Sequence, residues 1–275
     1  MFVTKKFAVF GKPIAQSKSP LIHSMFAKEV GIDIDYQAIL GNETNVEEDF
    51  ERFFDHPDAL GANVTMPFKE NAARWVDSLT DGAKAAEAVN TIIRKDNHFV
   101  GDSTDGVGLV SDLLRLDMQI EDRKVLLIGA GGAARGAFSN IINARPAQVD
   151  ILNRSLDNAQ RLSQVCPNEI TTCIDQVDKL GCYDLIINAT SLSLNNQLPA
   201  IDNKHTHNNT CVYDMVYRNE DTVFVAWAKS QGLQNVADGL GMLVGQAAES
   251  FYLWLGERPN VDSVIKALRI ELQNS

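Results

Sequence analysis

The chain has 275 residues, 45% of them hydrophobic, and its formal net charge at pH 7 is −11. The length suits two domains, and the hydrophobic fraction is enough for folded cores and excludes a disordered protein. The negative charge, without any basic stripe, argues against a nucleic-acid partner. For the same reason, an anionic small molecule would have to be bound by local positive groups.

The sequence shows no targeting or membrane pattern. Its first six residues lead directly into an apolar strand pattern and are too short for the apolar core of a signal peptide. The longest apolar stretch, 242–255, is interrupted by Gly245, Gln246, Glu249 and Ser250 and is therefore not a membrane span. The four cysteines lack C-x-x-C spacing, which favours reduced thiols over a disulfide or a metal site. We expect a cytoplasmic protein without a metal.

Strand and helix patterns alternate over the first 116 residues. Strands are expected at 7–10, 36–40, 61–65, 91–94 and 99–101. Helices are expected at 20–30, 46–54, 68–76, 83–89 and 106–116. Pro20 in the first turn and Gly31 just past the end mark the bounds of the first helix. The last of these helices is expected to bury one apolar face, made of Val107, Val110, Leu113 and Leu114.

A βαβ pattern begins at Lys124. The apolar run 125–128 predicts a buried parallel strand, which breaks into Gly129, Gly131 and Gly132 before an Ala-rich helix pattern. A G-x-G-x-x-G/A sequence in this setting indicates a dinucleotide site, because glycines let backbone N–H groups approach a pyrophosphate at the helix N-terminus. A glycine turn without a ligand is the alternative. Further strands are expected at 149–152, 184–190 and 212–215, and helices at 239–255 and 261–272.

The tip of the second strand of this pattern indicates which dinucleotide is bound. NAD enzymes usually place an acidic residue there, where it binds the ribose 2′-hydroxyl. This chain has Asn153, Arg154 and Ser155 at that point and no carboxylate. Because a guanidinium binds phosphate through a bidentate fork, these residues predict a 2′-phosphate and hence NADP.

Polar residues follow the expected strands of the first half. Ser17 and Ser19 precede the first helix, where two hydroxyls and helix N–H groups can bind an anion or a carboxylate. Asn63 and Thr65, two residues apart at a strand end, can point to the same side. Lys69 falls in the first turn of a helix, where a cation is unfavourable against the helix dipole. This placement makes Lys69 a candidate for proton transfer, with a solvated surface lysine as the alternative.

Two aspartates lie in the turn before the helix at 106–116. Asp105 can serve as a catalytic carboxylate or as the N-cap of that helix, and spacing alone favours the cap. Asp102 is the weaker candidate, since aspartate is common in turns.

Together these motifs resemble the shikimate dehydrogenase family over nearly the whole chain. The matching segments of the first half are 11–14 with 17–20, Gly-Ala-Asn-Val-Thr at 61–65, Pro-Phe-Lys at 67–69, 88–91 and 104–106. Those of the second half are 129–134, Asn-Arg-Ser at 153–155, 188–191, Tyr-Asp-Met-Val-Tyr at 213–217, 238–242 and Gln246.

The resemblance implies an α/β fold with an N-terminal α/β substrate domain and a Rossmann-type, doubly wound NADP-binding domain. The substrate domain is expected to be discontinuous, 1–106 plus 239–275, with 107–238 as the NADP-binding domain. The implied activity is the reversible NADPH-dependent reduction of 3-dehydroshikimate to shikimate, a step towards chorismate and the aromatic amino acids. The implied partner is this small-molecule substrate, and both a monomer and a homodimer remain open.

The family pattern also assigns roles to residues of this chain. Catalysis falls to Lys69 and Asp105, with Lys69 handling the proton of the reacting hydroxyl. The substrate carboxylate is assigned to Ser17, Ser19 and Tyr217, and the ring hydroxyls to Thr65, Asn90, Asp105 and Gln246. The cofactor pyrophosphate is assigned to Gly129, Ala130, Gly131, Gly132 and Ala133. The 2′-phosphate is assigned to Asn153, Arg154 and Ser155, the nicotinamide border to Met215 and Gly239, and a further cofactor-side position to Asp81.

The chain departs from the family pattern at two places. After 188–191 the family often carries a glycine-containing segment, whereas this chain continues Leu-Ser-Leu-Asn-Asn at 192–196, which leaves the loop shape beside the nicotinamide open. Ser103 stands where an Asn is common. Two other functions are alternatives. A quinate/shikimate dehydrogenase with relaxed cofactor use is disfavoured by Arg154, and a non-catalytic NADPH-binding regulator would lack Lys69 or Asp105.

Overall fold

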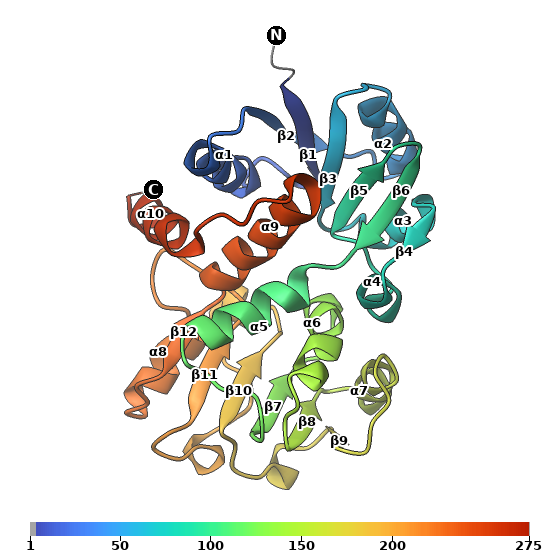
Figure 1. The fold of residues 1–275 in the computed structure, drawn as a ribbon. Coiled ribbons are helices and arrows are strands. Elements are labelled where there is room, and N and C mark those ends of the chain that lie inside the picture. The colour runs from blue at the N-terminus through green and yellow to red at the C-terminus, as the bar shows by residue number, and fades with distance from the viewer. Residues whose placement is uncertain (1–3, 275) are drawn as a thin grey trace. The chain divides into compact units, whose positions relative to one another are not determined.

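The chain folds into two compact units, which the computed structural model describes over residues 4–274. Unit 1 comprises Met1–Asp105 and Val244–Val264, and unit 2 comprises Gly106–Leu243 and Ile265–Ser275. Each unit is built on a six-stranded sheet accompanied by helices (Figure 1), which confirms the expected α/β class with two domains. Residues 1–3 and 275, which the expected domain boundaries include, lie outside the described residues.

The C-terminal boundaries differ from those expected. The sequence placed 239–275 in the first domain, whereas residues 239–243 and 265–275 group with unit 2. Both segments make hydrogen bonds to other residues of unit 2. The Arg269 guanidinium lies 2.5 Å from the Asp238 carboxylate, and the backbone N–H of Met242 donates to the Tyr213 hydroxyl at 3.2 Å.

Unit 1 contains the strands β1 (Lys5–Gly11), β2 (Ile34–Leu40), β3 (Ala59–Val64), β4 (Ser78–Leu79), β5 (Thr91–Lys95) and β6 (His98–Asp102). It also contains the helices α1 (Ser19–Val30), α2 (Val46–Phe54), α3 (Lys69–Trp75) and α4 (Asp81–Ala86). Pro20 in the first turn of α1 and the left-handed Gly31 (φ 71°) confirm the predicted bounds of this helix.

The sheet of unit 1 has the strand order β2-β1-β3-β5-β6-β4. Strand β1 pairs in parallel with β2 and β3, whereas β5 runs antiparallel to β3 and β6. Strands β1 and β3 are parallel neighbours, so they end side by side at the same edge of the sheet. Thr65 follows β3 directly, and Ser17 lies in the loop after β1. An aromatic cluster forms part of the core of this unit. In it the ring of Phe7 stacks on that of Trp254, with ring centroids 4.8 Å apart.

Helix α5 (Asp105–Arg115) leads from unit 1 into unit 2. The strands of unit 2 are β7 (Lys124–Ile128), β8 (Gln148–Leu152), β9 (Thr171–Ile174), β10 (Leu185–Asn188), β11 (Cys211–Asp214) and β12 (Val236–Asp238). Its helices include α6 (Gly132–Asn143), α7 (Leu156–Ser163) and α8 (Val223–Ser230), with short 3-10 turns η1 (Val177–Lys179), η2 (Leu192–Asn195) and η3 (Asn203–His205). The last two helices, α9 (Leu240–Leu255) and α10 (Val261–Gln273), each contribute residues to both units.

The sheet of unit 2 is parallel throughout, with the order β9-β8-β7-β10-β11-β12. Counted along the chain this is 3-2-1-4-5-6, the order of the Rossmann fold. Residues of α5, α6 and α7 pack in one core against alternate strand residues, and residues of α8 pack in a second core on the other face. A dinucleotide is therefore expected at the carboxyl ends of β7 and β10, where the strand order reverses.

Candidate active site

The two predicted catalytic residues form an ion pair within unit 1. Lys69 is the first residue of α3 and Asp105 the first residue of α5, and Lys69 Nζ lies 2.5 Å from Asp105 Oδ2. Their side chains are 29% and 15% exposed. The lysine is thus held by a half-buried carboxylate, which is not the setting of a solvated surface lysine. An ammonium held in this way can give a proton to a substrate oxygen or take one back.

Asn90 connects this pair to a third predicted residue. Its buried side-chain Nδ2 donates to Asp105 Oδ1 at 2.8 Å and to Gln246 Oε1 of α9 at 3.3 Å. The Asp105 carboxylate therefore bonds to Lys69 and Asn90, and Asp105 is the first residue of α5. Asp102 has the structural role expected of a turn aspartate, since its Oδ1 accepts from Thr80 Oγ1 at 2.6 Å.

The predicted carboxylate-binding serines lie at the start of α1. The Ser17 hydroxyl accepts from the backbone N–H of Ser19 at 3.3 Å, which fixes the turn into the helix. Thr65 follows β3, where its N–H donates to the carbonyl of Phe10 in β1 at 2.8 Å. Gly11 permits this approach, because a Cβ there would overlap the Thr65 methyl group.

Asn90 also belongs to a buried polar network in unit 1. No role is assigned from the sequence to the other members of this network. The Asn63 side chain donates to Asn90 O at 3.1 Å and to Ser250 Oγ of α9 at 3.0 Å, and accepts from the Tyr36 hydroxyl at 2.7 Å. The ring of His23 stacks on that of Tyr36 at 4.3 Å. Burial lowers the pKa of His23 to about 3, opposed by the Asn63 side chain, so His23 is neutral at physiological pH.

The glycine loop of unit 2 meets the steric demands of a dinucleotide. Gly129 has φ 103°, and a Cβ there would lie 2.8 Å from the Thr190 methyl group, so this position requires glycine. At Gly131 and Gly132 a Cβ would meet nothing within 4 Å. Internal packing therefore does not require glycine at these two exposed positions, whereas a phosphate approaching the N-terminus of the 12-residue helix α6 does.

The residues predicted to bind a 2′-phosphate follow β8. Asn153 Nδ2 donates to the carbonyl of Ser155 at 2.9 Å, and the Ser155 hydroxyl caps α7 by accepting from Asn158 N at 3.3 Å. Arg154 is exposed and makes no hydrogen bond or ion pair with any residue that the structure describes. Its guanidinium is thus available to an anionic ligand, while the Ser155 hydroxyl already has a structural role.

The remaining predicted residues are found in separate places. Met215 and Tyr217 follow β11 in unit 2, and a Cβ on Gly239 would overlap the carbonyl of Met215. Tyr217 belongs to a different unit from Ser17 and Ser19. Asp81 begins α4 in unit 1 with a fully exposed side chain and pairs with Lys84 at 3.3 Å, so its assignment to the cofactor stays a prediction.

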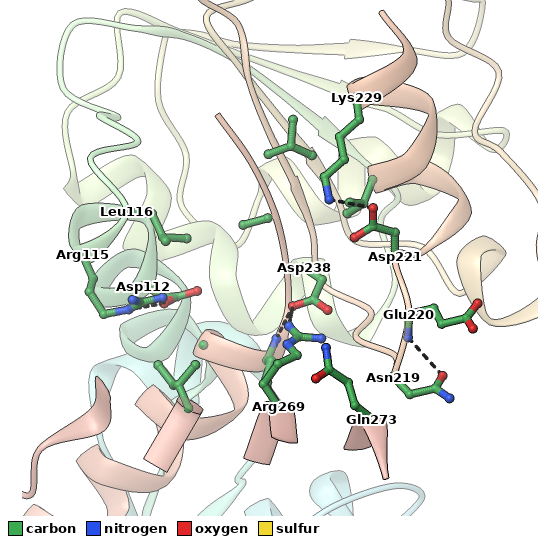
Figure 2. A pocket seen from close by; sticks show the side chains of 16 residues that line it. Asp112, Arg115, Leu116, Asn219, Glu220, Asp221, Lys229, Asp238, Arg269 and Gln273 are labelled. Atoms are coloured by element: carbon green, nitrogen blue, oxygen red, sulfur yellow. Dashed lines mark hydrogen bonds and ion pairs between the residues drawn. The ribbon is translucent and has the colours of Figure 1, made fainter. Parts of the chain in front are cut away.

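Unit 2 also has a cavity of about 580 Å³ beside β12 (Figure 2). None of the predicted site residues lines it. Each cation that lines it pairs with a lining carboxylate: Arg115 with Asp112 at 2.8 Å, Lys229 with Asp221 at 2.6 Å, and Arg269 with Asp238 at 2.5 Å. Over the described residues, the cavity is therefore lined by no unpaired cation of the kind that Arg154 presents, whereas the lining carboxylate of Glu220 has no cation paired with it.

Comparison with known proteins decides the family. Family models match residues 9–92 (shikimate dehydrogenase substrate binding domain), 112–213 (shikimate/quinate 5-dehydrogenase) and 239–269 (shikimate 5'-dehydrogenase C-terminal domain). A shikimate dehydrogenase (NADP(+)) of Cellvibrio japonicus is 44% identical over 98% of this chain and 99% of its own length. The chain belongs to the shikimate dehydrogenase family. The resemblance seen in the sequence is thereby confirmed.

Other relatives agree with this membership. A shikimate dehydrogenase (NADP(+)) of Vibrio campbellii is 42% identical over 98% of this chain and 97% of its own length. Among solved structures, the Thermus thermophilus shikimate 5-dehydrogenase in complex with NADP(H) and shikimate has a TM-score of 0.88 and 28% identity, covering 98% of this chain and all of that one. Both relatives match this chain over nearly its whole length.

Two further features of the described residues bear on other classes of function. None of the helices between residues 4 and 274 has the length and apolar character needed to span a bilayer. Over the same residues no cluster of three or more His, Cys, Asp or Glu side chains is arranged to hold a metal ion.

Proposed function

We infer that this member of the shikimate dehydrogenase family catalyses the reversible NADPH-dependent reduction of 3-dehydroshikimate to shikimate. The observation that carries the inference is the 2.5 Å pair of Lys69 and Asp105, which Asn90 joins to Gln246. These contacts gather an acid–base group and three further ligands for hydroxyls in one unit. A non-catalytic regulator has no need of this pair.

In the direction of reduction, the Lys69 ammonium gives its proton to the carbonyl oxygen as that oxygen becomes a hydroxyl. In the reverse direction the Lys69 amine takes this proton from the hydroxyl. The Asp105 carboxylate stabilises the ammonium form of Lys69 and accepts a hydrogen bond from a ring hydroxyl. Ser17 and Ser19 hold the substrate carboxylate, and Thr65, Asn90 and Gln246 hold its hydroxyls.

We assign the substrate to unit 1 and NADP to unit 2. The loop from Gly129 to Ala133 would hold the pyrophosphate against the N-terminus of α6, and Arg154 would hold the 2′-phosphate. Met215 and Gly239 would border the nicotinamide. When bound, NADPH supplies the hydride that reduces the carbonyl carbon. The described residues fit this cofactor because Gly131 and Gly132 leave open space and Arg154 is unpaired.

We further propose that the enzyme acts in the cytoplasm as a monomer or homodimer, on a route to chorismate and the aromatic amino acids. The proposed activity is tested by following NADPH absorbance with 3-dehydroshikimate, and then with NADH in place of NADPH. The reverse reaction is followed with shikimate and with quinate. Oxidation of NADPH that depends on 3-dehydroshikimate is the expected result. Its absence, with NADP binding intact, would refute the activity.

A further inference from the structure

The carboxylate of Asp214, at the end of β11, is completely buried in unit 2. Its Oδ1 accepts from Asn188 Nδ2 at 3.0 Å and from the backbone N–H of Val216 at 3.1 Å. Its Oδ2 accepts from the hydroxyls of Ser193 and Thr222, each at 2.6 Å. All four donors are neutral, so hydrogen bonds rather than a cation stabilise this buried charge. Loss of one donor should therefore destabilise the Asp214 carboxylate more than it would if a cation were paired with it.

The four donors come from different segments that meet at one edge of the sheet. Asn188 ends β10, Ser193 lies in η2, Val216 follows β11, and Thr222 caps α8. Strands β10, β11 and β12 form the second mononucleotide half of the sheet, and ligands bind at the carboxyl ends of such strands. Asp214 thus ties the loop after β10 to the loop after β11.

Three further hydrogen bonds fix the same loops. The Arg218 guanidinium donates to Asn196 Oδ1 at 3.0 Å and also to the carbonyl of Leu194. The N–H of Gly239 donates to the Val216 carbonyl at 3.2 Å, against the segment that carries Met215. The segment 192–196, where the chain departs from the glycine-containing form common in the family, is therefore anchored at both ends.

We propose that Ser193 and Asp214 are positioning residues that hold the loop 190–196 and Met215 in the arrangement that receives the nicotinamide ring. Ser193 connects the two loops through its hydroxyl, a group that a glycine at this position would not supply. The proposal rests on the proposed function, since it takes Met215 and Gly239 as residues that border the nicotinamide.

The test compares two ligands of the folded enzyme by calorimetry: NADP⁺ and 2′-phospho-ADP-ribose, which lacks only the nicotinamide. We expect Ser193→Ala to raise the Kd of NADP⁺ about tenfold, or about 1.4 kcal/mol, and to leave the Kd of the fragment unchanged. Asp214→Asn should show the same pattern with a larger change. Ser230→Ala is the matched control, because the exposed Ser230 hydroxyl bonds only to neighbours at the end of α8: it donates to the carbonyl of Trp227 and accepts from the Gln231 side chain.

The comparison separates positioning from a merely structural role. Loss of global stability in Ser193→Ala would weaken both ligands alike, and equal weakening would overturn the proposal. An unchanged Kd of NADP⁺ would overturn it as well. A parent enzyme that binds neither ligand would refute the proposed function together with this inference. If Asp214→Asn does not fold, Ser193→Ala still decides between these outcomes, because it removes only one of the four donors.

Discussion

Removing the amine of Lys69 should cost the enzyme most of its turnover. Lys69 Nζ lies 2.5 Å from Asp105 Oδ2, which places the proton-transfer group beside a carboxylate that Asn90 fixes at 2.8 Å. General acid–base catalysis contributes roughly 10²–10⁴-fold to rate, or about 2.7–5.4 kcal/mol of barrier. We expect Lys69→Met, which keeps the length of the side chain but not its charge, to lower kcat by this amount.

Substrate binding should change much less than turnover in this variant. A hydrogen bond that the Lys69 ammonium donates to the substrate is charge-assisted and is worth about 1.5–3 kcal/mol, which is roughly a ten- to hundredfold change in affinity. Asp105 keeps its bond to Asn90, and the hydroxyl ligands Thr65 and Gln246 are untouched. The KM of shikimate should therefore rise no more than about a hundredfold, which is the low end of the loss expected in kcat.

The assay is the NADPH-linked rate in both directions, with circular dichroism to establish that the variant is folded. Lys6→Met is the matched control, because the Lys6 side chain is about as exposed as that of Lys69 and pairs with a carboxylate, Asp35, at 2.9 Å in the same unit. Turnover close to that of the parent enzyme in a folded Lys69→Met protein would refute the reasoning. The acid–base role would then pass to Asp105 alone.

Three further predictions address the cofactor, the substrate and stability. Arg154→Ala should raise the KM of NADP about ten- to a hundredfold and that of NAD far less, and equal weakening of both would make Arg154 structural. Replacing Ser17 or Ser19 by Ala should weaken shikimate binding measured by calorimetry, and a parallel loss of NADP affinity would contradict the division of labour between the units. Because burial lowers the pKa of His23 from 6.5 to about 3, the unfolded chain binds one more proton between these values. The stability that His23 contributes is therefore complete above pH 6.5 and falls by up to about 1.4 kcal/mol per pH unit as pH drops towards 3. His23→Phe should flatten this part of the pH dependence of the urea-unfolding free energy, and an unchanged slope would contradict the assignment.

Local signals were sufficient wherever one segment determines its own structure. Pro20 and Gly31 marked α1 correctly because each acts through its own backbone dihedral angle. The apolar run before Gly129 likewise predicted β7 and the turn into α6, since a strand buried on both faces is apolar throughout. The edge strands β9 and β12 escaped prediction because they are short and only partly buried, which leaves a weak hydrophobic pattern.

Tertiary packing overrode the local pattern in two helices. Leu114 was expected on the buried face of α5 but is 55% exposed, and Asp112 occupies the buried face instead, where its carboxylate accepts from the Tyr213 hydroxyl at 2.7 Å. The pattern favoured Leu114 because it is apolar, and a buried aspartate is explained by its partners, Tyr213 on β11 and Arg115 on α5 itself. Helix α8 was not predicted, since its Val-Phe-Val-Ala-Trp start is typical of a strand.

In the candidate active site, too, the contacts between residues far apart in the sequence could not be predicted. Lys69 and Asp105 could be selected one by one from their positions at helix starts, but their 2.5 Å contact joins residues 36 positions apart. Ser250 carried no signal, because a serine in an apolar helix pattern reads as an interruption. Its hydroxyl lies 2.7 Å from Thr91 Oγ1 and 3.0 Å from Asn63 Nδ2, completely buried. Each of these small polar residues would be costly to bury alone, and together they satisfy one another. A polar network of this kind specifies one arrangement of α9 against β3 and β5, and so fixes the place of Gln246 one helical turn before Ser250.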